Sequence, residues 1–119
     1  MIHEQLNDRL HRVKMSSMRA LKFPEREDLS LHDVLYALSD PTRLCVVRSL
    51  ALNSEQTCGS CDLGIAKSTM SHHFKVLREA GIIHMRPCGT SYLNSLRRED
   101  LDARFPGLLD AVLRAADGI

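Results

Sequence analysis

The chain has 119 residues, 44% of them hydrophobic, and its formal net charge at pH 7 is +1. This length fits a single domain, 1–119, with a small core of the kind that often gains stability by pairing with a second copy. No apolar run approaches the ~20 residues of a membrane span, and the charged residues 1–14 exclude a secretory signal, so we expect a cytoplasmic homodimer with no membrane partner.

A helix is predicted over about residues 3–19, near the amino terminus. Leu6, Leu10 and Val13 are spaced for one face of a helix and give it an apolar side. Pro24 and the charged residues that follow it then predict a loop, because proline breaks a helix and the run is polar. We expect the 3–19 helix to be a dimerisation element.

Two further helices are predicted between residues 30 and 53. Ser30 is a suitable N-cap for the first of them. Asp40 can cap the second, and Pro41 then takes the first helical position, where its missing N–H and its fixed φ suit the turn. The expected core-facing residues of these helices are Leu31, Val34, Leu35, Leu38, Leu44, Val47 and Leu50. A polar loop over residues 53–56 follows.

The stretch 58–81 is the most informative part of the sequence. It predicts a short helix, a tight turn at Gly64, and a longer helix on which Met70, Phe74 and Leu77 have the spacing of a core-facing stripe. The other side of the longer helix carries small hydroxyls, an imidazole and an ammonium group, which bond to phosphates and base edges. These groups belong to Ser68, Ser71, His72 and Lys75. The layout predicts a DNA-reading helix that ends at Gly81, where a left-handed residue is needed.

The small net charge conceals an uneven distribution. Residues 67–98 carry six basic side chains and one acidic side chain, whereas the segments 31–66 and 99–119 are both net acidic. A cationic segment that coincides with the predicted reading helix favours a nucleic-acid partner. An ordinary solvated surface also carries clustered charge, so this signal is weaker than the layout of the helix.

Residues 82–96 are predicted to form a two-stranded hairpin with a turn at residues 87–89. Two strands are not stable alone, so we expect this hairpin to pack on the helices through Ile83, Tyr92 and Leu96. Such a hairpin beside a reading helix is a wing.

A last helix is predicted over about residues 106–116, with Pro106 at its start. Its apolar side consists of Leu108, Leu109, Val112 and Leu113. We expect this side to pack on the 3–19 helix, so that the two terminal helices form a helical dimer interface. The predicted fold class is mainly α with a small β-hairpin.

Residues 38–44, LSDPTRL, and residues 67–81, KSTMSHHFKVLREAG, resemble the ArsR/SmtB winged-helix transcriptional regulators. Together with the glycine-tipped hairpin, the resemblance covers about residues 30–96. It implies a winged helix-turn-helix fold and a homodimer whose two reading helices enter successive major grooves of double-stranded DNA. It also implies repression of a promoter, released by an effector.

The resemblance assigns DNA-facing positions to Lys67, Ser68, Thr69, Ser71, His72 and Lys75. We interpret the neighbouring His73 as a packed, hydrogen-bonded core residue rather than a DNA contact. Thr90 stands at the wing tip where the family often has arginine, so wing binding is expected to depend on Arg86. Ala66 replaces the usual serine N-cap, which lowers the stability of the helix by ~1 kcal/mol unless another group caps it.

Cys58 and Cys61 leave three interpretations open. Many members of the family sense metals through a Cys-x-Cys pair or through residues of the last helix, and neither set is intact here. A zinc or other metal site would need further ligands, for which His72, His73 and Cys88 are candidates. The two thiols could instead form a disulfide that acts as a redox switch, or they could be inert packing residues. No cofactor is expected beyond such a metal.

The sequence contains no Ser/His/Asp order, paired catalytic carboxylates or glycine-rich phosphate loop, so we predict that the protein is not an enzyme. The favoured function is a DNA-binding transcriptional regulator, a repressor that binds a palindromic promoter site as a homodimer, with a response to thiol oxidation as one option for its control. One alternative is a metal-responsive repressor that uses Cys58 and Cys61. The other is a winged-helix module that binds a protein partner without reading DNA. The effector could be a small molecule, an oxidant or a metal.

Overall fold

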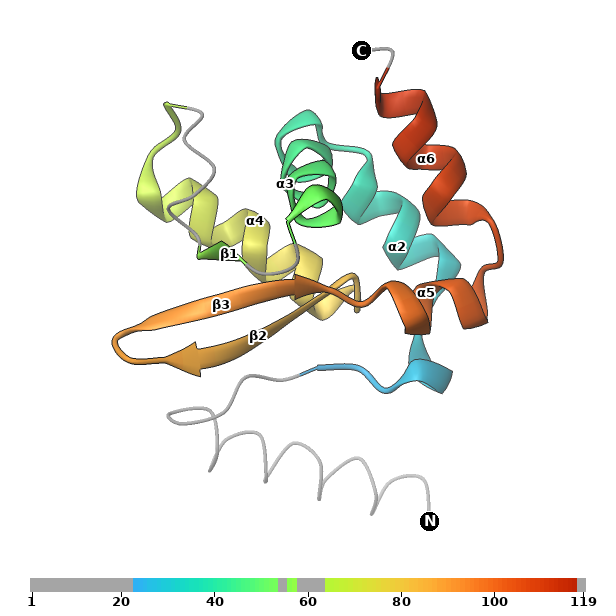
Figure 1. The fold of residues 1–119 in the computed structure, drawn as a ribbon, viewed down its shortest axis with the longest axis horizontal. Coiled ribbons are helices and arrows are strands. Elements are labelled where there is room, and N and C mark those ends of the chain that lie inside the picture. The colour runs from blue at the N-terminus through green and yellow to red at the C-terminus, as the bar shows by residue number, and fades with distance from the viewer. Residues whose placement is uncertain (1–22, 54–55, 58–63, 118–119) are drawn as a thin grey trace.

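The computed structural model describes residues 23–53, 56–57 and 64–117 (Figure 1). The first elements are the 3-10 turn η1 (Arg26–Asp28), the helices α2 (Leu31–Leu38) and α3 (Pro41–Leu52), and the strand β1 (Gln56–Thr57). After them come helix α4 (Lys67–Glu79), the strands β2 (Ile83–Cys88) and β3 (Ser91–Leu96), and the helices α5 (Arg98–Arg104) and α6 (Leu108–Asp117). This order confirms the predicted class, mainly α with a β-hairpin, while the 3–19 helix lies outside the described residues.

Helices α2 and α3 begin where the sequence predicts. Oγ of Ser30 accepts a hydrogen bond from the backbone N–H of Asp33 at 3.4 Å, and Oδ2 of Asp40 accepts one from the backbone N–H of Arg43 at 3.0 Å. Each bond satisfies an N–H group that the first turn of a helix leaves without a partner. Pro41 occupies the first turn of α3, as expected.

The buried side of α2 differs from the prediction. Val34 and Leu38 are buried, but Leu31 and Leu35 are 47% and 46% exposed, and Ala37 is fully buried instead. At 100° per residue, the stripe through Val34, Ala37 and Leu38 is rotated away from the other two leucines. This stripe faces α3 and α4, the helices that α2 contacts.

On α3, Val47 and Leu50 are buried as predicted, Leu44 is half-buried, and Val46 joins the core. The buried side of α3 therefore extends beyond the predicted positions.

Among the residues described, no helix combines the length and apolar character needed to cross a bilayer.

The turn of the hairpin lies at residues 89–90, later in the chain than the predicted turn at residues 87–89. Strand β2 pairs antiparallel with β3 as far as Cys88 and Ser91, so a two-residue turn at Gly89 and Thr90 connects them. Gly89 has φ +62°, the conformation that the first position of a type II′ turn requires. Pro87 stays within β2, which tolerates it because β2 is an edge strand.

The hairpin belongs to a three-stranded sheet. Strand β1 pairs with β3, in the order β1-β3-β2, where the sequence predicts only a polar loop. On the helix-facing side, Ile83 and Asn94 are fully buried and Leu96 is half-buried. Tyr92 is 39% exposed, so its predicted packing on the helices is wrong. It pairs with Pro87 close to the turn, away from the buried part of the sheet.

The carboxyl-terminal part contains one helix more than predicted. Helix α5 buries a single residue, Leu101, in a highly charged segment, and so offers little apolar periodicity. Helix α6 begins at Leu108 rather than at Pro106, because Pro106 and Gly107 form a turn in which Gly107 has φ +82°. Leu109 is buried and the other predicted apolar residues of α6 are half-buried.

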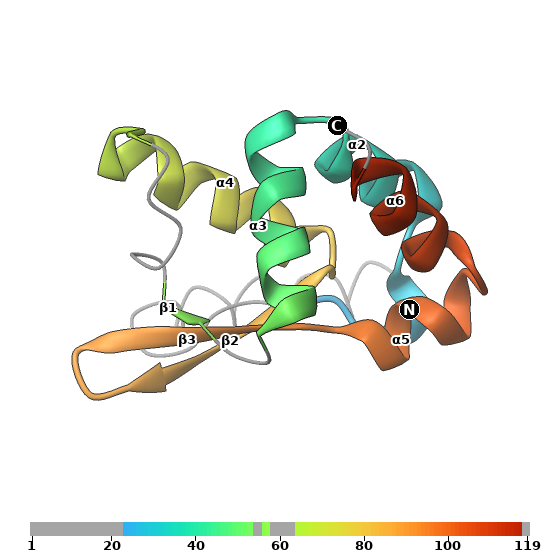
Figure 2. The ribbon, with the colours of Figure 1, turned by 45° about the horizontal axis from the view of Figure 1, so that its top comes forward.

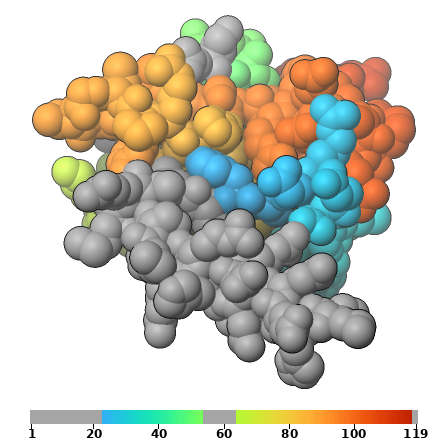
Figure 3. Space-filling view, turned by 90° about the horizontal axis from the view of Figure 1, so that it is seen from below, coloured from blue at the N-terminus to red at the C-terminus, as the bar shows by residue number. Residues whose placement is uncertain are grey.

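The segment before α2 lies beside the hairpin and α5 (Figure 3). Asp100 accepts hydrogen bonds from Nε of Arg26 at 2.6 Å and from Nε of Arg97 at 2.9 Å. Nη1 of Arg97 also donates to the carbonyl of Pro24 at 2.8 Å. The hydrogen bond from Arg26, together with that from Arg97, holds the pKa of Asp100 below its ordinary value. These bonds fasten the segment to the rest of the domain.

Asp100→Asn is expected to lower the free energy of unfolding by about 1 kcal/mol or less at pH 7, because water screens the partly exposed ion pairs. The pKa of Asp100 is depressed by folding, so its carboxylate stabilises the fold above the unfolded pKa and loses this effect as pH falls through the folded pKa. The free energies of unfolding of variant and wild type should therefore begin to converge below about pH 4 and become equal only below the folded pKa of Asp100. A constant difference from pH 7 to pH 2, or an equal loss in Glu99→Gln, would contradict this explanation.

Candidate nucleic-acid interface

Helix α4 has the two faces that the sequence predicts. Met70, Phe74 and Leu77 are 7%, 3% and 0% exposed, and they join the core formed with α2, α3 and the sheet. The helix ends before Gly81, which has φ +82°, and a Cβ at this position would overlap Cδ2 of Leu29. Gly64, which precedes the helix, has φ +68°, the left-handed conformation that the predicted turn requires. The short helix predicted before it lies outside the described residues.

The residues predicted to face DNA lie on the outside of the molecule. Six of them belong to α4 and are exposed: Lys67, Ser68, Thr69, Ser71, His72 and Lys75. The seventh, Arg86, is exposed on β2. The amino-terminal end of α4 and the tip of the hairpin extend toward the same end of the molecule (Figures 1 and 2). One elongated nucleic acid could therefore contact both elements.

The amino-terminal end of α4 has no side-chain cap. Ala66 occupies the N-cap position and makes no side-chain hydrogen bond, as the sequence predicts. The N–H groups of the first turn and the positive end of the helix dipole therefore favour an anion at this end.

Ala66→Ser is expected to raise the free energy of unfolding by ~1 kcal/mol, because a serine hydroxyl can accept from an N–H of the first turn. Chemical denaturation measures this gain. Ala66→Asp should stabilise the helix similarly, but its carboxylate would repel a phosphate, so DNA affinity should fall only in this variant. Equal affinities of the two variants would show that no phosphate approaches this end of α4.

The cationic segment 67–98 does not form one continuous positive surface. Arg97 binds Asp100, and Nη1 of Arg98 donates to Asp110 at 2.9 Å. Arg78 is half-buried, and its Nη1 contacts Sδ of Met85 at 3.9 Å. The free positive charge is therefore confined to fewer side chains than the sequence predicts. Lys67 and Lys75 remain exposed on α4, and Arg86 is exposed on β2. The two lysines make no ion pair with any residue that the structure describes.

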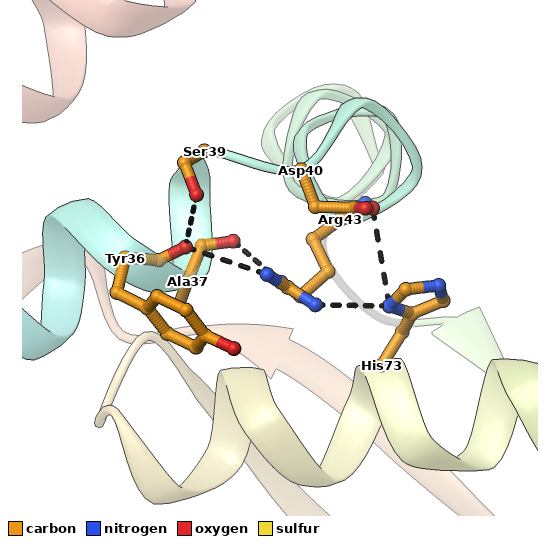
Figure 4. A network of polar contacts seen from close by, with 6 residues as sticks. All are labelled: Tyr36, Ala37, Ser39, Asp40, Arg43 and His73. Atoms are coloured by element: carbon orange, nitrogen blue, oxygen red, sulfur yellow. Dashed lines mark hydrogen bonds and ion pairs between the residues drawn. The ribbon is translucent and has the colours of Figure 1, made fainter.

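His73 turns away from the exposed face of α4 toward α3 (Figure 4). Its side chain is 12% exposed, and its Nδ1 lies 3.1 Å from Nη1 of Arg43 and 3.9 Å from Oδ2 of Asp40. This geometry confirms the interpretation of His73 as a packed, hydrogen-bonded residue.

Arg43 is 6% exposed and connects three helices. Its Nε donates to the carbonyl of Ala37 at 2.7 Å, its Nη2 donates to that of Tyr36 at 3.4 Å, and its Nη1 reaches His73. The guanidinium carbon also lies 5.4 Å from the centre of the Tyr36 ring. The buried position of Arg43 was not predicted, although Arg43 lies one turn before Val46 and Val47, on the buried side of α3.

The cysteine pair 58 and 61 lies outside the described residues. Of the described cysteines, Cys45 is half-buried on α3 and Cys88 is exposed on β2, and both are free thiols. Across residues 23–53, 56–57 and 64–117, no group of three or more His, Cys, Asp or Glu side chains could hold a metal ion. His72 and His73 diverge, one outward and one inward, with ring centres 6.1 Å apart.

Comparison with known sequences agrees with this geometry. Residues 40–84, from the cap of α3 to β2, match the family model described as "Bacterial regulatory protein, arsR family". The chain is 33% identical over 91 residues to YceK of Bacillus subtilis, an uncharacterized HTH-type transcriptional regulator, with 74% of this chain and 91% of YceK covered. An uncharacterized HTH-type transcriptional regulator of Methanocaldococcus jannaschii is 38% identical over 60 residues, which cover 49% of this chain and 67% of that protein.

Solved structures share the fold. HlyU from Vibrio cholerae superposes with a TM-score of 0.58 at 23% identity, over 71% of this chain and 88% of HlyU. The transcriptional repressor BigR from Xylella fastidiosa gives a TM-score of 0.55 at 24% identity, over 97% of this chain and 96% of BigR. The predicted winged helix-turn-helix fold is thereby confirmed.

Proposed function

We propose that this chain, which belongs to the ArsR family of bacterial DNA-binding transcriptional regulators, is a repressor that binds a palindromic promoter site as a homodimer. One observation carries the proposal. Helix α4 buries an apolar stripe and exposes hydroxyl, imidazole and ammonium groups on its other side. In a bacterium, a protein that binds promoter DNA acts in the cytoplasm.

Each exposed group of α4 has a role suited to its chemistry. The major groove of DNA admits an α-helix, and hydroxyl and imidazole groups can bond to base edges or phosphates there. We assign this role to Ser68, Thr69, Ser71 and His72. Lys67 and Lys75 would neutralise phosphates, and Arg86 would contact the flanking backbone from the wing.

Exposed apolar side chains support the homodimer. Leu31 and Leu35 are about half exposed on α2, and Val112 and Leu113 remain only partly buried on α6. Helices α2 and α6 lie side by side (Figures 1 and 2). Apolar surface of this kind marks interaction sites, and we propose that it pairs with a second copy, together with the segment 3–19 that the sequence predicts to be helical. A two-fold dimer would read half-sites about one helical turn apart.

A gel-shift experiment with the DNA upstream of the protein's own gene tests the proposal. We expect a shifted complex and a footprint with two half-sites, and a scrambled duplex of equal length should bind more weakly. A transcriptional reporter should be repressed by the protein and not activated. If the protein bound no duplex, the alternative of a protein-interaction module would replace this function.

The same gel shift tests the effector. If a disulfide between Cys58 and Cys61 releases DNA, oxidant should abolish the complex of the wild type but not that of Cys58→Ser. If a metal is the effector, zinc should abolish the DNA complex of the wild type under reducing conditions. A complex unchanged by both treatments would indicate inert cysteines and a different effector.

A further inference from the structure

We propose that Arg43 and His73 position the reading helix α4, and that protonation of His73 breaks this contact and weakens DNA binding. The inference rests on the proposed function, because it concerns the helix that we assign to DNA. Its elements are a buried arginine, a largely buried histidine and the carboxylate of Asp40, all drawn in Figure 4.

Arg43 is a rigidly held donor. Its Nε and Nη2 bond to the carbonyls of Ala37 and Tyr36, in the last turn of α2. These carbonyls belong to the group that the end of a helix leaves without helical partners. With two of its nitrogens fixed to α2, the planar guanidinium has its Nη1 aimed at His73 of α4, 3.1 Å away.

The hydrogen bond between Arg43 and His73 gives the packing of α4 a directional preference that burial of its apolar face does not provide. Burial of Met70, Phe74 and Leu77 holds the helix in place, but apolar attraction has little directional preference. A hydrogen bond depends on both distance and angle. The bond to His73 therefore fixes the rotation and the axial position of α4, and with them the placement of the neighbouring His72 and of the other exposed groups.

The contact requires an unprotonated Nδ1. An arginine side chain is always charged and has only donors, so Nδ1 of His73 must accept and the neutral ring carries its proton on Nε2. A proton on Nδ1 would place two donors and two positive charges 3.1 Å apart. Histidine is the side chain whose charge most readily changes in the physiological pH range, so the pH dependence of DNA binding tests this contact.

The charged groups around His73 determine where the ring turns. Within the described part of the chain, these are Arg43 of α3 and Asp40, the N-cap residue of α3. His72 is next to His73 on α4, and the ring of Tyr36 of α2 lies against the guanidinium. The backbone N–H of Arg43 holds the pKa of Asp40 below its usual value, so this carboxylate is charged at mildly acidic pH. The ring of a protonated His73 would turn away from Arg43 and toward Asp40, whose Oδ2 is 3.9 Å from Nδ1. Helix α4 would then lose its hydrogen bond to Arg43.

The test compares His73→Asn with the wild type. The Asn Oδ1 lies close to where the imidazole Nδ1 was, accepts from Arg43 and does not titrate. DNA affinity of the full-length protein for its upstream duplex would be measured from pH 8 to pH 5.5 at constant ionic strength. We expect the wild type to lose about tenfold in affinity over this range, the effect of one hydrogen bond to a charged group, and His73→Asn to stay within about twofold.

Two further variants separate positioning from folding. His73→Leu keeps an apolar side chain but has no acceptor, and should bind weakly at every pH while its circular dichroism stays unchanged. His32→Asn, a matched control at an exposed histidine of α2 that has no assigned DNA contact, should retain the acid-induced loss. The proposal is overturned if wild type and His73→Asn share one pH profile, or if His73→Leu binds as tightly as the wild type at pH 8. A wild type that binds no duplex at any pH would reject the proposed function itself.

Discussion

Phe74→Ala is expected to lower the free energy of unfolding by about 3–5 kcal/mol, whereas the change at its neighbour, Lys75→Ala, should stay within about 0.5 kcal/mol. Phe74 is 3% exposed and fills the core between α4 and the helices beneath it, so its removal leaves a cavity. Lys75 is exposed and makes no ion pair with a described residue. Equilibrium denaturation of the two variants measures both changes.

The same two variants should lose DNA binding for different reasons. Lys75→Ala should weaken binding in a protein that remains folded, while Phe74→Ala should lose binding in proportion to the unfolded fraction. Phe74→Leu is the control for the core, because it keeps most of the apolar volume and should recover much of the stability. Equal losses of stability in the two alanine variants would mean that the faces of α4 are assigned wrongly.

Features that depend on local sequence were predictable. The caps at Ser30 and Asp40, the turn at Gly64 and the end of α4 before Gly81 all follow from the conformational preferences of one residue and its neighbours. The faces of α4 were also predictable, because a helix of 13 residues is long enough for its periodicity to be read.

Features that depend on distant contacts were not predictable. Leu31 has the same local signal as Val34, and only the position of α3 and α4 decides which one is buried. Strand β1 has two residues, and its pairing with β3 spans nearly forty residues of sequence. Helix α5 has one buried residue and therefore almost no periodic signal.

The candidate DNA-binding site also has features that depend on local sequence and features that depend on distant contacts. The sequence identifies which residues of α4 are exposed, but not which positive charges near them are already paired. Arg97 and Arg98 are neutralised by Asp100 and Asp110, and the first of these carboxylates also binds Arg26, 74 residues away in the chain. A charge count along the sequence cannot include such partners, so it overestimates the surface available to DNA.

DNA affinity is expected to fall by roughly a thousandfold when the salt concentration rises from 50 to 200 mM. If Lys67, Lys75 and Arg86 each neutralise one phosphate, a homodimer makes about six such contacts, and each contact contributes about −0.9 to the slope of log affinity against log salt. The expected slope is therefore about −5. Fluorescence anisotropy titrations at several salt concentrations measure it.

Single substitutions show which basic side chains contribute to this salt dependence. Lys75→Ala removes two phosphate contacts per dimer, so its slope should be shallower by about 2. Arg98→Ala removes the same formal charge but from an ion pair with Asp110, so its slope should equal that of the wild type. If both variants changed the slope equally, net charge rather than the geometry of α4 would govern binding. Only a shallower slope confined to Lys75→Ala would show that α4 itself lies against the phosphates.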